Sequence, residues 1–73
     1  MNLTRVTGLP LSKLREKYLV LILDNVNDFL SKYNQSDILV YFDEQKLYFF
    51  KDNICFVYFF KNDKKEALGL IKG

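Results

Sequence analysis

The sequence predicts a small α+β domain in which one long N-terminal helix packs on a three- to four-stranded antiparallel β-meander. Apolar residues recur every three or four positions through the first half of the chain, and from Ile38 the period changes to two. Nine of the twelve Phe and Tyr residues then fall between Tyr41 and Phe60, in segments typical of strands. At 73 residues the chain is one domain, in which we expect an irregular lead-in at 1–9, a helix at 10–33, a three-strand meander at 37–61, and an edge strand or a short helix at 64–73.

The predicted helix begins at Pro10, because the first turn of a helix tolerates a residue without an N–H, and ends near Tyr33. A second interpretation fits the same residues, with Tyr18–Leu23 as a buried strand and Asp24 as the cap of a short helix. Periodicity alone does not separate the two for so short an apolar run. The single helix is favoured because one stripe runs through both halves without a change of phase, at Leu11, Leu14, Tyr18, Ile22, Val26, Phe29 and Tyr33.

The predicted strands are joined by a turn at Asp43-Glu44, with or without Gln45, and by a turn at Asp52-Asn53, where Asn tolerates the left-handed backbone of a tight hairpin. We take both as two-residue turns to derive the register. These turns set the register, with Val40 opposite Leu47 and Phe49 opposite Phe56. The three strands are expected at Ile38–Phe42, Lys46–Lys51 and Ile54–Lys61.

The last segment allows two structures. Asp63 followed three residues later by Glu66 resembles a helix capping box, but Gly69 argues against a stable helix. A loop at 62–65 followed by a short edge strand fits equally well, and we favour the strand slightly.

The alternation divides the meander into two apolar faces. The first is the predicted seat of the helix and holds Ile38, Val40, Phe42, Leu47, Phe49, Ile54, Phe56, Tyr58 and Phe60. The second is larger than the apolar patch that a soluble monomer usually exposes. We therefore expect it to bind a partner, unless residues 1–9 or the tail fold over it. The predicted partner-binding residues are Leu39, Tyr41, Lys46, Tyr48, Phe50, Val57 and Phe59.

Residues suited to catalysis or metal binding are scarce. The chain has no His, and with Cys55 alone a tetrahedral zinc site of the usual nitrogen and sulfur ligands is not available. The serines lack a base to activate them, and we interpret Asp43-Glu44 and the pair Asp24 and Asp28 as solvated charges. We expect Cys55 to be a small core residue. The prediction is therefore no enzyme, with no catalytic or metal site, no cofactor and no small-molecule substrate.

Two functions remain from the sequence. The first is a protein–protein interaction module or accessory subunit, which docks another protein or a second copy through the second face. The alternative is a small RNA-binding or ribosome-associated factor, in which Tyr41, Tyr48 and Phe59 stack on bases. The net charge of +2 does not indicate nucleic acid by itself, but the N-terminal region is locally basic. Its candidate phosphate contacts are Arg5, Lys13, Arg15 and Lys17.

One fragment bears on the RNA hypothesis. Residues 56–59 resemble the second half of the RNP1 strand of RNA-recognition motifs, whose aromatics stack on bases. Asp52, Asn53 and Cys55 depart from the first half of that motif, so no family is assigned. Finally, the apolar run Tyr18–Leu23 is too short for a signal peptide or a membrane span, which predicts a cytoplasmic protein with no membrane partner.

Overall fold

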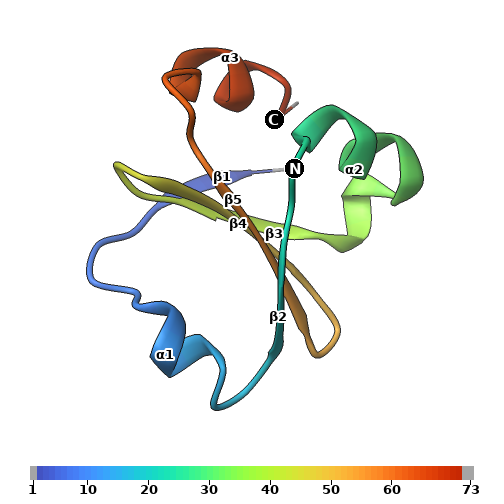
Figure 1. The fold of residues 1–73 in the computed structure, drawn as a ribbon. Helices are drawn as coiled ribbons and strands as arrows, with labels where there is room; N and C mark the ends of the chain where they lie inside the picture. Colours follow the sequence, from blue (N-terminus) through green and yellow to red (C-terminus); the bar gives the residue numbers. More distant parts are fainter. Residues whose placement is uncertain (1, 72–73) are drawn as a thin grey trace.

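The structure is a computed structural model that describes residues 2–71, an α+β fold with a five-stranded mixed sheet and three short helices in that range. Figure 1 shows α2 and α3 on one side of the sheet and α1 on the other. The strands lie in the order β1-β3-β4-β5-β2. Along the chain the elements are β1 (Leu3–Arg5), α1 (Leu11–Leu14), β2 (Leu19–Ile22), α2 (Val26–Lys32), the 3-10 helix η1 (Gln35–Asp37), β3 (Leu39–Phe42), β4 (Lys46–Lys51), β5 (Ile54–Phe59) and α3 (Lys64–Gly69).

The prediction of one long helix at 10–33 is wrong, because a strand interrupts it. Strand β2 pairs in parallel with β5, and the short helices α1 and α2 lie on either side of β2 in the sequence. Helix α2 has its own start signal, since the Asn25 Oδ1 accepts a hydrogen bond from the Asp28 N–H at 3.0 Å. Two short amphipathic helices and an aliphatic strand share a common phase, and the second interpretation of this segment describes it better, although the helix cap is Asn25 and not Asp24.

The sheet is not the predicted antiparallel meander of three to four strands. Strands β3, β4 and β5 do pair antiparallel, but β1 and β2 add a parallel strand at each edge. The predicted irregular lead-in at 1–9 therefore contains strand β1. Parallel pairing requires a crossover connection, which sequence periodicity does not reveal.

The register of the second hairpin is confirmed, and that of the first is wrong by two residues. Phe49 lies opposite Phe56 as predicted, but Val40 lies opposite Phe49 and not opposite Leu47. The turn is centred one residue later, because the Asp43 carboxylate accepts hydrogen bonds from the Gln45 and Lys46 N–H groups. A shift of two residues keeps every side chain on its predicted face.

Both faces of the sheet are covered in part by the chain itself. The nine residues predicted for the first face all belong to, or pack against, the core beneath α2 and α3. On the second face, Leu14 of α1 joins Tyr48, Cys55 and Val57 in a separate buried cluster. Val6, Leu9 and Leu11 pack against that cluster, so the lead-in folds over the second face, as the alternative interpretation expected.

The tail forms the short helix α3 in place of the favoured edge strand. The Asp63 carboxylate accepts hydrogen bonds from the Lys61 N–H at 2.7 Å and from the Tyr58 hydroxyl at 2.6 Å, which fixes the turn before the helix. Asn62 in this turn has a φ of 65°, a conformation that Asn tolerates well. Within residues 2–71, no helix has the length and apolarity needed to cross a membrane.

Candidate functional site

The predicted partner-binding residues do not form one surface. Tyr48 and Val57 have no exposed area, so neither presents a surface to a partner in this structure. Lys46 and Phe59 lie together, with the lysine Nζ 5.8 Å from the Phe59 ring centroid. The remaining three residues, Leu39, Tyr41 and Phe50, line a groove beside α1.

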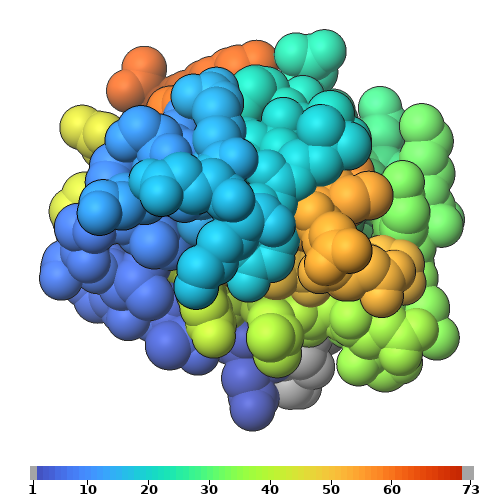
Figure 2. All heavy atoms as spheres, turned by 90° about the horizontal axis from the view of Figure 1, so that it is seen from below, coloured from blue at the N-terminus to red at the C-terminus, as the bar shows by residue number. Residues whose placement is uncertain are grey.

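This aromatic groove is one part of the second face that the lead-in leaves open. Figure 2 shows the lead-in, α1 and the following turn, in blue and cyan, spread across the sheet, whose yellow-green and orange atoms stay visible beside them. The groove has a volume of about 670 Å³, within the range of ligand pockets. Its lining residues are Leu9, Lys13, Leu14, Glu16, Lys17, Tyr18, Leu39, Tyr41 and Phe50.

Three aromatic rings shape the groove. The Tyr18 ring meets the Phe50 ring edge-on, with centroids 5.1 Å apart, and the Tyr41 ring lies 5.4 Å from the same Phe50. Leu39, at the start of β3, is 62 % exposed. The groove therefore offers aromatic walls, which protein interfaces favour, and an exposed aliphatic side chain.

The charges beside the groove are mostly positive. Lys13 and Lys17 line it together with Glu16, two cations against one anion. The other two predicted phosphate contacts do not line it. Arg5 forms an ion pair with Glu44 at 2.6 Å, and Arg15 is exposed at the end of α1. The structure thus brings two of the four predicted basic residues together with three of the predicted partner-binding residues.

A partly buried hydrogen bond anchors the lead-in beside the groove. The Tyr48 hydroxyl contacts both the Leu9 carbonyl oxygen, at 3.2 Å, and the Asp43 carboxylate. Burial works to raise the pKa of Asp43, but hydrogen bonds from Tyr48 and from two backbone N–H groups outweigh it and lower the pKa from 3.8. Burial, and then the hydrogen bond to Asp43, raise the pKa of Tyr48. The Tyr48 hydroxyl therefore links the lead-in to the β3–β4 turn through hydrogen bonding.

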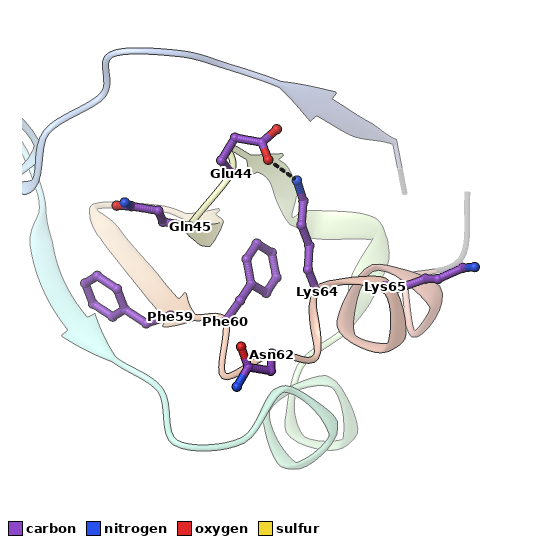
Figure 3. A pocket seen from close by; sticks show the side chains of 7 residues that line it. All are labelled: Glu44, Gln45, Phe59, Phe60, Asn62, Lys64 and Lys65. Carbon is purple, nitrogen blue, oxygen red and sulfur yellow. Dashed lines mark ion pairs between the residues drawn. The ribbon is translucent and has the colours of Figure 1, made fainter.

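A second hollow lies at the end of β5 away from the Asp52-Asn53 turn, where β5 leads into α3 (Figure 3). Its volume is about 600 Å³, and the Glu44 and Lys64 side chains meet across it at 3.1 Å. Phe59 and Phe60 form part of its wall, with Gln45, Asn62 and Lys65. The Glu44 side chain of this ion pair is 68 % exposed, so the pair contributes little to stability.

Other reactive groups are isolated. Cys55 is buried, and burial raises the pKa of its thiol to about 11, so it is protonated and unreactive at neutral pH. Among residues 2–71, no cluster of three His, Cys, Asp or Glu side chains is arranged to hold a metal ion.

The sequence interpretation missed an exposed aliphatic strand at the edge of the sheet. In β2, Leu19 is 60 % exposed, Leu21 41 % and Ile22 52 %. The signal was present in the second interpretation of Tyr18–Leu23, which made this run a strand, although it placed the strand in the interior.

Comparisons with protein-family models, with curated proteins and with solved structures found no match to this chain. The features of the described residues that bear on function are two apolar surfaces, the aromatic groove and the β2 edge, and the charges around them.

Proposed function

We propose that this chain is a non-enzymatic protein–protein interaction module, and that the aromatic groove accepts an apolar side chain of a partner protein. The observation that carries the proposal is the open groove of about 670 Å³ walled by Tyr18, Tyr41 and Phe50. A small domain gains stability from covering such residues, and here the lead-in and α1 cover the neighbouring Tyr48, Cys55 and Val57 but leave the groove open.

The charges specify the chemistry of the partner. Lys13 and Lys17 outnumber Glu16 along the groove. Opposite charges across an interface steer association and select partners. The proposed ligand is therefore a peptide segment that carries one large apolar residue flanked by Asp or Glu, with the apolar residue between the aromatic walls and the acids near the two lysines.

The same geometry supports RNA binding less well. Base stacking needs exposed rings, and Tyr48, one of the three predicted stacking residues, is wholly buried with its hydroxyl hydrogen-bonded. Arg5 is engaged with Glu44, away from the lining of the groove. Single-stranded RNA is accordingly the competing outcome in the test below.

The proposal is tested with a displayed library of random peptides, followed by titration of synthetic peptides from the enriched pool. We expect enrichment of sequences with one Phe, Leu or Trp among acidic residues. Leu39→Glu should abolish binding, because it places a carboxylate at the groove mouth, where it repels the acidic peptide and opposes apolar burial. Leu70→Glu is the matched control, since Leu70 is also exposed, at 39 %, and does not line the groove.

Amide chemical-shift mapping locates the ligand. Shifts confined to the residues around Tyr18, Leu39 and Phe50 support the groove, and shifts elsewhere contradict it. A labelled single-stranded RNA oligonucleotide is titrated in parallel. Binding of the RNA that weakens steeply with salt, without enrichment of any peptide, would replace this proposal with the RNA alternative.

A further inference from the structure

The edge strand β2 lacks the protection that exposed sheet edges usually carry. Natural proteins guard such edges with charges, proline, bulges or very short strands. Strand β2 is Leu-Val-Leu-Ile, and three of these four side chains are exposed. The opposite edge, β1, is only three residues long and carries Thr4 and the ion-paired Arg5. The β1 edge thus carries polar and charged side chains and the β2 edge carries exposed aliphatic ones. Within residues 2–71, no strand pairs with the outer side of β2.

The ladder to β5 fixes which backbone groups of β2 point outward. The Leu19 N–H donates to the Asn53 carbonyl at 2.9 Å, and the Leu23 N–H donates to the Val57 carbonyl at 2.7 Å. In a parallel pair, alternate residues direct both backbone groups to the same neighbour. Leu19, Leu21 and Leu23 therefore face β5, and the N–H and C=O groups of Val20 and Ile22 face away from the sheet.

We infer that β2 pairs antiparallel with β2 of a second copy, about a twofold axis through Leu21, to join two sheets into one. In this register the outward N–H and C=O groups of Val20 form hydrogen bonds with those of Ile22 in the other copy. By the twofold symmetry, Ile22 of the first copy pairs in the same way with Val20 of the second. Leu21 then lies opposite its own counterpart, and Leu19 lies opposite Leu23. Every apposed pair is aliphatic, and each side chain stays on the face it already occupies.

Charge favours a second copy in this direction. Lys17 precedes the strand and Asp24 follows it, so the two ends of the segment carry opposite charges. An antiparallel copy brings the Lys17 end of one strand to the Asp24 end of the other, whereas a parallel copy would place like charges together. The guarded β1 edge does not complement β2, so the association closes as a dimer and does not continue into a fibre.

The interface is short, so the dimer is expected to dissociate on dilution. The test is sedimentation velocity of the intact chain over a range of concentrations, with two charge variants at the twofold axis. Leu21→Lys and Leu21→Glu should each sediment as a monomer, because each sets like charges directly opposite one another. An equimolar mixture of the two should restore the dimer, since Lys then lies opposite Glu.

Restoration of the dimer in the mixture of Leu21→Lys and Leu21→Glu depends on the register of the pairing and not on the fold alone. Leu39→Glu is the control that should keep the dimer, because Leu39 is exposed on another strand. Circular dichroism of each variant checks folding. If a Leu21 variant unfolds, N-methylation of the Ile22 amide in synthetic protein removes one outward donor, keeps the side chain, and should also give a monomer. A monomeric wild type at every concentration, or a charge mixture of folded variants that stays monomeric, overturns the inference; either result leaves peptide binding in the groove unaffected.

Discussion

The Tyr48 hydroxyl provides the sharpest test of how the second face is built. Tyr48→Phe removes the single hydroxyl proton, which is donated mainly to the charged Asp43 carboxylate and is shared with the more distant Leu9 carbonyl oxygen, and leaves the ring in place. Hydrogen bonds to charged groups contribute about 1.5–3 kcal/mol. We therefore expect a loss of about 2 kcal/mol, from a total of roughly 4–11 kcal/mol for a domain of this size. For so short a chain, this corresponds to a fall in Tm of about 8–16 °C.

The pH dependence separates this cause from a general loss of packing. The pKa of Asp43 is lowered in the folded protein, so the stabilisation from its carboxylate is present above the ordinary value of 3.8 and is lost as the pH falls through the lower, folded value. Urea unfolding followed by circular dichroism should show a large difference between wild type and Tyr48→Phe near neutral pH. That difference should shrink below pH 3.8. Tyr41→Phe is the control, since its hydroxyl makes no hydrogen bond within residues 2–71. A difference that does not change with pH would refute the assignment to Asp43.

Three further predictions concern other parts of the fold. Burial raises the pKa of Cys55 from 9.0 to about 11, and the hydrogen bond to Asp63 raises that of Tyr58 from 10.0 to about 12. The stabilisation from these two protonated groups should therefore be fully present below pH 9 and be lost between pH 9 and about pH 12. Cys55→Ala should move the onset of alkaline unfolding to higher pH. Asn25→Ala should cost about 1 kcal/mol through loss of the α2 cap, with Asn27→Ala nearly neutral in the same urea titration. Lys17→Glu should weaken the selected acidic peptides and invert the salt dependence of their binding, as measured by fluorescence anisotropy.

The strand pattern was predictable because it is local. Alternation from Ile38 to Phe60 assigned nine residues to the first core correctly, and the Asp52-Asn53 turn fixed the second hairpin. Asp52 adopts a φ of 54° in that turn, a left-handed conformation that Asp tolerates. The first hairpin shifted because the Asp43 side chain, and not the length of the polar break, positions the turn.

The first half of the chain was not predictable from periodicity, because its structure is decided by distant contacts. The periodicity of Tyr18–Leu23 favoured a helix, and the strand forms because Asn53 and Val57 of the neighbouring segment accept the Leu19 and Leu23 N–H groups. The lead-in carries no strong pattern of its own. Leu9 is held through its carbonyl oxygen by Tyr48, 39 residues later. The same contacts account for the outcome at the site, since covering Tyr48 and Val57 divides the broad predicted face into the groove around Tyr41 and Phe50 and the separate pair Lys46 and Phe59.

The two proposed surfaces are compatible and their combination has a consequence of its own. No residue of β2 itself lines the aromatic groove, but Lys17, which precedes β2, belongs both to the groove and to the charged end of the paired segment, so the two surfaces share that charge. A dimer would carry two grooves in a fixed relation, and a partner with two acidic-apolar segments would then bind more tightly than either segment alone. Leu21→Lys should remove this gain while leaving the affinity of a single peptide unchanged, and Leu39→Glu should remove both. A tandem peptide that binds the wild type no more tightly than a single peptide, although the linker spans the two grooves, would show that the grooves do not act together.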